Sequence, residues 1–357
     1  MSEPLVIQSH RGPYGVQFEQ GALSRLAARP AAKSHFILDA NVATLYARDL
    51  APILGSSSLL VIEATEAAKT LDRFTGYVEA LVSQSVRRDH LLVAIGGGII
   101  QDITAFLATT LLRGLHWEFH PTTLLAQADS CIGSKSSINV GVAKNILGTY
   151  CPPDRIVIDP ELLQTLAEVD VRSGIGEMLK VHAIAGPDRF DEIAAAYGQL
   201  QNDRERLRYF IGRSLEIKKA IIEVDEFDTG PRNVMNYGHS FGHAIEAATD
   251  FGVPHGIAVT IGMDLANFVA VKSGRVAESH FVRMHSILSR NSQGFHSVSV
   301  PQDRFFAALG KDKKNVGDRL SLILPDAAGV PQRTVVDNSP EFREICARYF
   351  SEVLAHG

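Results

Sequence analysis

The segment Leu91-Leu-Val-Ala-Ile-Gly-Gly-Gly-Ile-Ile-Gln-Asp102 decides the fold of this 357-residue chain. Its consecutive apolar residues are typical of a parallel strand that is buried on both faces. Three glycines follow, and apolar residues at helical spacing over 102–112 predict a helix that begins near Asp102. A glycine turn between a strand and a helix lets the backbone approach a ligand, and the helix N-terminus favours a phosphate. Taken alone, this glycine-rich sequence is equally compatible with an ordinary tight turn that binds no ligand.

The same alternation of strand and helix repeats on both sides of this segment. Further short apolar runs predict strands, the stretch 71–81 predicts a helix, and Asp39 and Thr122-Thr123 fall at or just after strand ends. This pattern indicates a doubly wound, Rossmann-like α/β domain, in which ligands bind beyond the carboxyl ends of the strands. The additional predicted strands are 35–39, 59–63, 116–119 and 155–159.

The second half of the chain has a helical pattern, with apolar residues spaced three and four apart over 207–221. Prolines 152, 153 and 160 punctuate the change from one pattern to the other. We therefore predict an α/β domain over residues 1–160 and a mostly α-helical domain over residues 161–357.

Composition excludes several classes of protein. The 35 Lys+Arg and 40 Asp+Glu residues give a net charge of −5, and no basic cluster interleaved with aromatic residues predicts nucleic-acid binding. No apolar run approaches the roughly 18 residues that span a membrane, and the N-terminal residues lack the basic and apolar regions from which a secretion signal would be predicted. The cysteines Cys131, Cys151 and Cys346 are odd in number and widely spaced, as in a reduced, cytoplasmic protein.

Two of the 13 histidines, His239 and His243, are four residues apart and share one face of a predicted helix. That spacing suits metal ligation by neutral imidazoles, although a helix with two partly exposed histidines is the simpler interpretation. His255 follows nearby, and Glu177 lies in a helical segment of the same half. One carboxylate and two imidazoles would suit a catalytic Zn²⁺ with positions open for a substrate.

Several cations could line a pocket for an anionic substrate. Lys218 lies on the apolar face of a predicted helix, where a buried ammonium needs a partner, although a lysine whose head reaches solvent is the simpler interpretation. The others, each compatible with a surface position, are Lys135, Lys144, Lys180, Arg113 and Arg232.

A series of motifs resembles the 3-dehydroquinate synthase family of the sugar phosphate cyclase superfamily. The motifs are collinear from about residue 39 to about residue 324. They comprise Gly96-Gly-Gly-Ile-Ile-Gln-Asp102, Leu112-Arg-Gly114, Pro121-Thr-Thr-Leu-Leu-Ala-Gln-Ala-Asp-Ser130, Lys144-Asn-Ile-Leu-Gly148, Gly176-Glu-Met-Leu-Lys180, Glu216-Ile-Lys218, Asp225-Glu226, Arg232-Asn-Val-Met-Asn-Tyr-Gly-His-Ser-Phe-Gly-His-Ala-Ile-Glu246, His255-Gly256 and Lys311-Asp-Lys-Lys314.

This resemblance implies a homodimer whose first domain binds NAD⁺ and whose helical second domain carries Zn²⁺ or Co²⁺, with the active site between the domains. Glu177, His239 and His255 would be the metal ligands, so His243 would contact the substrate instead. The NAD⁺-binding residues would be Asp39, Asn41, Glu66, Lys69, Gly97, Gly98, Asp102, Thr122, Thr123 and Thr165, with Asp129 near the nicotinamide.

The resemblance also implies which residues hold a sugar phosphate substrate. Its phosphate, carboxylate and hydroxyls would contact Lys135, Lys144, Asn145, Lys180, Lys218, Arg232, Asn236, His243 and Lys313, and Arg113 would reach the phosphate bound by the partner subunit. The implied reaction is an NAD⁺-dependent elimination of phosphate followed by an intramolecular aldol closure, in which metal polarisation and orientation do most of the catalytic work.

The chain departs from the family pattern at several positions. Gln101 replaces a glycine, Ser134 lies in a Gly-Ser-Lys-Ser run where Gly-Gly-Lys-Thr is usual, Ile257 replaces a glutamate, and Tyr150-Cys151-Pro152 replaces the usual Gln-Pro. These changes indicate a side branch. Lys218, Arg232 and Asn236 are nevertheless present, and unpaired cations in a closed pocket are costly, so we expect a carboxylate-bearing 2-keto-3-deoxy sugar acid phosphate as substrate.

Three alternatives remain open at this stage. One is another cyclase branch of the 2-epi-5-epi-valiolone or 2-deoxy-scyllo-inosose synthase type, acting on a sugar phosphate without a carboxylate. Another is a metal-dependent polyol dehydrogenase of the same fold. The last is a non-catalytic binding protein on a cyclase scaffold.

Overall fold

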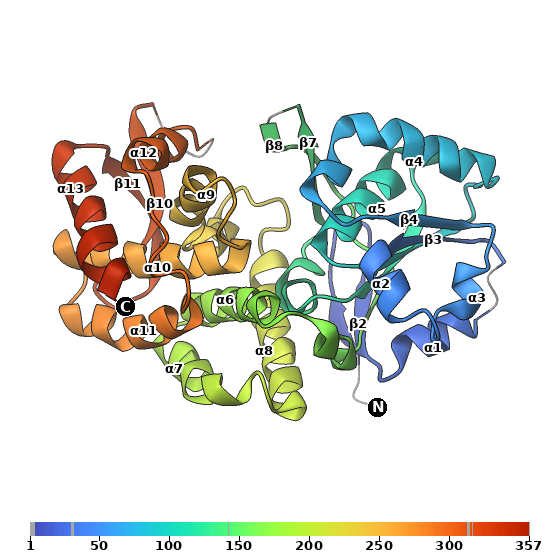
Figure 1. The fold of residues 1–357 in the computed structure, drawn as a ribbon, viewed down its shortest axis with the longest axis horizontal. Coiled ribbons are helices and arrows are strands. Elements are labelled where there is room, and N and C mark those ends of the chain that lie inside the picture. Colours follow the sequence, from blue (N-terminus) through green and yellow to red (C-terminus); the bar gives the residue numbers. More distant parts are fainter. Residues whose placement is uncertain (1–3, 30–31, 142, 313–314, 316, 357) are drawn as a thin grey trace. The chain divides into compact units, whose positions relative to one another are not determined.

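The strand that decides the fold lies inside a seven-stranded sheet in a computed structural model of the chain (Figure 1). The structure describes residues 4–29, 32–141, 143–312, 315 and 317–356. The sheet is parallel except where β1 pairs with β2. In spatial order its strands are β1 (Leu5–Ile7), β2 (Tyr14–Phe18), β9 (Arg155–Ile158), β6 (His116–Pro121), β5 (Leu91–Gly96), β3 (Ser34–Asp39) and β4 (Leu59–Ile62).

Helices connect these strands, so the predicted Rossmann-like α/β architecture is confirmed. Phe36, Leu38 and Ile95 from β3 and β5 pack with Leu23 and Leu50 in one fully buried cluster, which explains why those strands are apolar at successive positions. The helices of this unit are α1 (Ala22–Ala27), α2 (Ala40–Leu45), α3 (Ala51–Leu54), α4 (Leu71–Ser83) and α5 (Gly98–Thr110).

The helix after the glycine turn begins earlier than predicted. The α5 helix starts at Gly98 instead of near Asp102, because only Gly97 retains an extended backbone as the N-cap residue. A two-stranded hairpin of β7 (Lys135–Val140) and β8 (Ala143–Tyr150) was also not predicted. Nearly all of β8 is exposed, so it lacks the apolar run from which the other strands were inferred.

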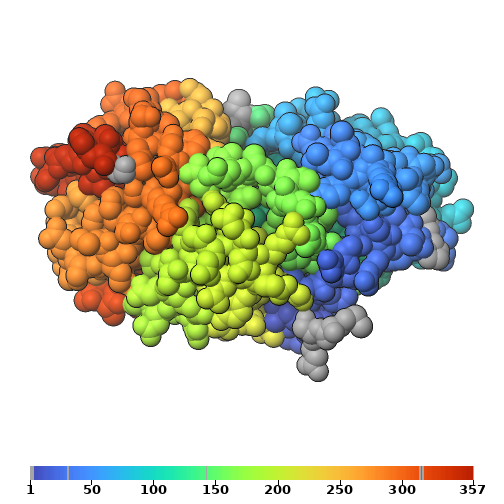
Figure 2. All heavy atoms as spheres, turned by 60° about the horizontal axis from the view of Figure 1, so that its bottom comes forward, coloured from blue at the N-terminus to red at the C-terminus, as the bar shows by residue number. Residues whose placement is uncertain are grey.

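The second unit is mostly helical, as predicted, and adds an antiparallel hairpin. Within it α10 is buried from Gly256 to Ala270 and contacts α6, α9 and α11, while α7 and the first part of α8 lie at the surface (Figure 2). Its elements are α6 (Glu168–Ile184), α7 (Pro187–Ala196), α8 (Arg204–Ile222, whose end from Lys218 onward belongs to the first unit), α9 (His239–Ala248), α10 (His255–Lys272), α11 (Glu278–Asn291), α12 (Gln302–Gly310), β10 (Arg319–Pro325), β11 (Pro331–Asp337) and α13 (Pro340–Arg348).

The chain divides into two compact units, and one segment from the second half of the chain belongs to the first unit. One unit contains Met1–Leu166 and Lys218–Phe227, and the other contains Ala167–Ile217 and Asp228–Gly357. The short segment Lys218–Phe227 joins the first unit because Lys218 binds Asp129 and Glu226 accepts a hydrogen bond from Ser134. The predicted functional division at residues 160/161 stays a prediction. Among the described residues, no helix is both long and apolar enough to cross a membrane.

Candidate active site

Three histidines and one glutamate of the second unit converge on one point. One ring nitrogen from each of His239, His243 and His255 lies within 4.8 Å of the others. The Oε1 atom of Glu177 is 3.3 Å from Nε2 of His255 and 3.6 Å from Nε2 of His239. The structure therefore brings together the three predicted metal ligands, and it places His243 beside them.

The outward-facing ring nitrogens of two of these histidines have partners of their own. Nδ1 of His255 is 3.2 Å from Oε2 of Glu246, and Nδ1 of His239 is 3.3 Å from the carbonyl oxygen of Tyr237. A proton on each Nδ1 atom leaves both Nε2 lone pairs directed toward Glu177, which is the arrangement expected around a bound cation.

The charge around His255 also fits a cation. Burial lowers the pKa of His255, but the carboxylates of Glu177 and Glu246 outweigh that effect and raise its pKa to about 10. The two carboxylates thus favour a positive charge at this point, and a proton or a divalent metal ion can supply it. Two imidazoles and a carboxylate form a donor set suited to Zn²⁺ or Co²⁺.

Glycines next to each of these residues allow their helices to approach closely. A Cβ atom on Gly176 would lie 2.3 Å from the carbonyl oxygen of Gly256, and one on Gly242 would lie 3.0 Å from that of Ala258. Gly238 has a positive φ of 76° and its Cβ would lie 2.5 Å from the carbonyl oxygen of Val259. Because α6, α9 and α10 pack almost backbone to backbone, the neighbouring side chains reach a common point.

The second unit also carries predicted substrate contacts. Nζ of Lys180 lies 2.5 Å from Oε2 of Glu177, and both side chains are about 3 % exposed or less. Arg232 is buried, and Nδ2 of Asn236 donates to the carbonyl oxygen of Asn233 at 3.0 Å. Lys313 lies outside the described residues.

In the first unit, three of the predicted NAD⁺-binding residues, Asp39, Thr122 and Thr123, lie against the glycine turn. A Cβ atom on Gly97 would lie 2.9 Å from Cγ2 of Thr123, and one on Gly96 would lie 3.2 Å from Cβ of Asp39. The backbone N–H of Thr122 donates to the carbonyl oxygen of Gly96 at 2.9 Å. The turn therefore needs glycines, and it presents the N-terminus of α5 in the manner that suits a pyrophosphate.

Asp39 and Asn41 contact each other, and Thr165 contacts Tyr46. Asp39 caps α2 by accepting a hydrogen bond from the backbone N–H of Asn41 at 2.8 Å, and burial raises the pKa of the Asp39 carboxyl. The hydroxyl groups of Thr165 and Tyr46 are 3.1 Å apart.

A polar network links other predicted NAD⁺ contacts to the β7–β8 hairpin. Nζ of Lys69 donates to Asp102 at 2.9 Å and to Asn145 at 3.0 Å. Asp102 also accepts from the backbone N–H of Ser137, while Glu66 accepts from Asn139 at 2.9 Å. These contacts hold the hairpin that carries Asn145 and the exposed residues Lys135 and Lys144.

Lys218 has the anionic partner that its buried position requires. Its Nζ donates to the carbonyl oxygen of Asp129 at 2.6 Å and to the carboxylate of Asp129 at 2.5 Å. Both residues are less than a tenth exposed. The structure therefore assembles the predicted nicotinamide neighbour and a predicted substrate contact into one pair.

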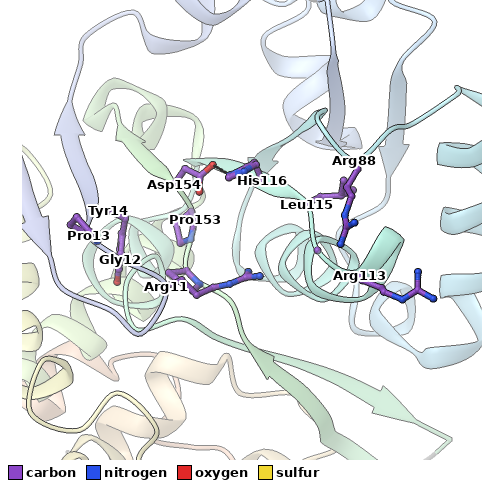
Figure 3. A pocket seen from close by; sticks show the side chains of 12 residues that line it. Arg11, Gly12, Pro13, Tyr14, Arg88, Arg113, Leu115, His116, Pro153 and Asp154 are labelled. Atoms are coloured by element: carbon purple, nitrogen blue, oxygen red, sulfur yellow. Dashed lines mark hydrogen bonds and ion pairs between the residues drawn. The ribbon is translucent and has the colours of Figure 1, made fainter.

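Arg113 lines a separate cationic pocket of about 330 Å³ in the first unit (Figure 3). Arg11 and Arg88 line the same pocket, and the one carboxylate in its lining, Asp154, pairs with His116 at 2.7 Å. Leu112, Arg113 and the following glycine all have positive φ values. Such strain is commonly kept where a side chain has a function.

Some residues of these sites carried no predicted role. Glu246 lies seven residues after His239 on α9, so its helical spacing could have indicated that it shares the face of the histidines. Ser137 contacts the predicted site residue Asp102, and Gln101 contacts Ser130, which directly follows Asp129. No spacing in the sequence could reveal those contacts.

Comparison with known families decides the classification. The family model described as 3-dehydroquinate synthase N-terminal matches residues 59–173, and the model described as 3-dehydroquinate synthase C-terminal matches residues 174–315. The chain belongs to the 3-dehydroquinate synthase family. The predicted family and the prediction of an enzyme are both confirmed.

Relatives named 3-dehydroquinate synthase match along most of the chain. The protein of Streptococcus suis (strain 05ZYH33) is 32% identical over 338 residues, covering 91% of this chain and 94% of that protein. The protein of Idiomarina loihiensis is 35% identical over 297 residues, covering 82% and 83%.

Solved structures of sugar phosphate cyclases have the same fold as this member of the 3-dehydroquinate synthase family. A 2-deoxy-scyllo-inosose synthase complexed with carbaglucose-6-phosphate, NAD⁺ and Co²⁺ matches with a TM-score of 0.82 and 23% identity, covering 97% of this chain and 100% of that chain. The 2-epi-5-epi-valiolone synthase of Streptomyces hygroscopicus subsp. jinggangensis 5008, with NAD⁺ and Zn²⁺ bound, matches with a TM-score of 0.81 and 27% identity, covering 95% and 97%.

Proposed function

We propose that this chain is an NAD⁺- and metal-dependent sugar phosphate cyclase that acts on a carboxylate-bearing 2-keto-3-deoxy sugar acid phosphate. The observation that carries the proposal is the convergence of Glu177, His239 and His255. The Nδ1 atoms of the two histidines have partners of their own, and these partners orient the rings. We further propose that the protein acts as a homodimer. We also propose that it acts in the cytoplasm, in keeping with three buried cysteines that form no disulfide.

Glu177, His239 and His255 would hold the metal ion in this proposal. A bound Zn²⁺ or Co²⁺ would polarise neighbouring hydroxyls of the substrate and orient them for oxidation. Lys180 neutralises the far oxygen of Glu177, so the near oxygen stays directed toward the histidines. His243, whose ring lies against those of His239 and His255, would contact the substrate.

The glycine turn and its neighbours would hold NAD⁺. A bound NAD⁺ would supply reversible hydride transfer without net consumption of the cofactor. Gly97 and Gly98 expose the N-terminus of α5 to the pyrophosphate. Thr122 and Thr123 lie against the turn. The proposed set is completed by Asp129, Asp39, Asn41, Glu66, Lys69, Asp102 and Thr165.

The remaining cations and amides would bind the substrate's anionic groups. Lys135, Lys144, Asn145, Lys218, Arg232, Asn236 and Lys313 would hold the phosphate, carboxylate and hydroxyls, and Arg113 would reach the phosphate in the partner subunit. These residues orient the substrate so that a phosphate oxygen can accept the proton removed during elimination. After phosphate departs, the same contacts hold the opened sugar for the aldol closure that forms the ring.

Another cyclase branch is the second candidate, because the fold matches those of two such synthases with TM-scores above 0.8. The two candidates differ in whether the substrate carries a carboxylate. The buried Lys218 already pairs with Asp129, so the choice rests on the joint presence of Lys218, Arg232 and Asn236, the set that the family resemblance assigns to the anionic groups of the substrate. This favours the acidic substrate.

A substrate panel tests the choice. The protein would be incubated with NAD⁺, Zn²⁺ and either 3-deoxy-arabino-heptulosonate 7-phosphate, sedoheptulose 7-phosphate or glucose 6-phosphate, and inorganic phosphate would be measured. We expect phosphate release from the first compound. Phosphate release only from the two sugar phosphates that lack a carboxylate would contradict the proposal. NADH formed in proportion to the substrate consumed would indicate a polyol dehydrogenase.

A further inference from the structure

Gln101 is the residue that stands where the family pattern has a glycine, and its side chain is buried at 5 % exposure. It forms two hydrogen bonds with one residue. Nε2 of Gln101 donates to the carbonyl oxygen of Ser130 at 2.6 Å, and Oγ of Ser130 donates to Oε1 of Gln101 at 2.7 Å. A glycine at this position could make neither bond.

This pair closes one side of the glycine turn. A Cβ atom on Gly98 would lie 4.0 Å from Oγ of Ser130, while Thr123 lies against Gly97 on another side. Gln101 is in the first turns of α5, and its backbone N–H donates to the carbonyl oxygen of Gly97. One side chain therefore connects the helix that follows the turn to the segment that faces it.

The contact extends from Ser130 to the Asp129–Lys218 pair. Asp129 precedes Ser130 directly, and it binds Lys218 through both its carbonyl oxygen and its carboxylate. The same segment is held further along, where Oγ of Ser134 donates to Glu226 at 2.7 Å. Ser134, at a φ of 65°, is also a departure from the family's glycine pattern.

We propose that Gln101 is a positioning residue that holds Ser130, and through it the Asp129–Lys218 pair, at a fixed separation from the glycine turn. This inference rests on the proposed function, because the space between the turn and Asp129 is the proposed nicotinamide end of the NAD⁺ site. A preformed site needs less ordering when the cofactor binds, so Gln101 raises the affinity for NAD⁺ without touching it.

NAD⁺ titration of the metal-loaded protein tests the inference. Gln101→Leu removes both bonds that join α5 to Ser130. We expect its Kd for NAD⁺ to rise about tenfold, with a lower kcat and unchanged metal content. Gln84→Leu is the matched control, because Gln84 also bonds a side chain and a backbone carbonyl, those of His35 and Leu59, away from the turn. It should lose thermal stability but bind NAD⁺ as the parent does.

Ser130→Ala provides a second, smaller change that breaks only the hydroxyl bond. Its Kd for NAD⁺ should rise less, and the double variant should be no worse than Gln101→Leu, because both changes remove the same contact. If Gln101→Leu does not fold, the Ser130→Ala titration decides the question.

Unchanged NAD⁺ affinity in the folded Gln101→Leu variant, or in Ser130→Ala where that variant decides, would overturn the inference. A parent protein that binds NAD⁺ but releases no phosphate from any substrate would overturn the proposed function and leave the role of Gln101 in binding intact. A parent protein that binds no NAD⁺ would overturn both.

Discussion

Glu246 contacts the proposed metal centre through His255. Its carboxylate lies 3.2 Å from Nδ1 of that imidazole. Glu246→Gln keeps an oxygen acceptor at this point but removes its negative charge, so the ring becomes a weaker ligand and is less firmly oriented. We expect the affinity for Zn²⁺ to fall by about tenfold or more, measured by competition with a chelator. Glu278→Gln, at an exposed position in the first turn of α11, should not change it.

Most other histidines have structural partners. His182 is fully buried, its Nδ1 bonds the carbonyl oxygen of Met178, and its ring packs against Phe210. Burial lowers the pKa of His182 to about 4. Because this value lies below that of the unfolded chain, the neutral ring stabilises the fold fully above pH 6.5, and this stability is lost as pH falls from 6.5 toward 4.

Replacing His182 should therefore reduce the acid sensitivity of folding. Between pH 7.5 and pH 5 the parent should lose about 2 kcal/mol of unfolding free energy through this residue. His182→Leu should lack that share, as measured by urea unfolding at both pH values. An equal loss in parent and variant would show that His182 does not titrate with folding.

The site could be predicted only in part from residue spacing. The four-residue interval pointed to His239 and His243, whereas His255 begins a different helix and its approach to Glu177 depends on how α6 and α10 pack. The resemblance supplied that ligand set in advance. Neither spacing nor resemblance could assign Gln101, because its two bonds to Ser130 join segments 29 residues apart.

At the scale of elements, the contact between α6 and α10 determines where Glu177 and His255 meet. Gly176→Ala would place a Cβ atom 2.3 Å from a backbone oxygen of Gly256, so the helices must separate. We expect a loss of about 1–3 kcal/mol in stability and weaker Zn²⁺ binding, measured by thermal unfolding and metal titration.

Gly212 provides the control on another helix. A Cβ atom there meets nothing within 4 Å, so Gly212→Ala should stabilise α8 by about 0.5–1 kcal/mol and leave metal binding unchanged. Equal effects of the two substitutions would contradict the importance of the close helix contact.

Burial determines which elements could be predicted from the sequence. The strands β3, β5 and β9 are apolar at successive positions because both faces are covered, and their predicted ranges agree with the structure to within one residue at either end. The β7–β8 hairpin lacks this signal, because its residues are mainly polar and β8 is exposed. Its place is set by side-chain contacts such as Lys69 with Asn145.

At the scale of the whole molecule, a net charge of −5 conceals local cationic sites. Arg11, Arg88 and Arg113 line one pocket, and Lys218 and Arg232 are buried elsewhere. The proposed homodimer assigns Arg113 to the partner's substrate, which makes each active site dependent on two copies of the chain.

Mixing two inactive variants tests that dependence. Arg113→Ala lacks the proposed phosphate contact, and His255→Ala lacks a proposed metal ligand. In a mixed dimer, the metal-bearing site of the Arg113→Ala subunit would receive Arg113 from its partner. We therefore expect phosphate-releasing activity to reappear after subunit exchange, up to one working site per mixed dimer. No recovery in dimers shown to be mixed would place Arg113 in its own subunit's site.

The most direct test of the central claim is the number of turnovers that each NAD⁺ supports. The protein would be supplied with Zn²⁺, an excess of 3-deoxy-arabino-heptulosonate 7-phosphate and a small, known amount of NAD⁺, and inorganic phosphate and NADH would be recorded together. We expect phosphate in large excess over the NAD⁺ supplied, with no accumulation of NADH. Phosphate release that stops at the amount of NAD⁺, or NADH that accumulates in step with substrate consumption, would contradict it.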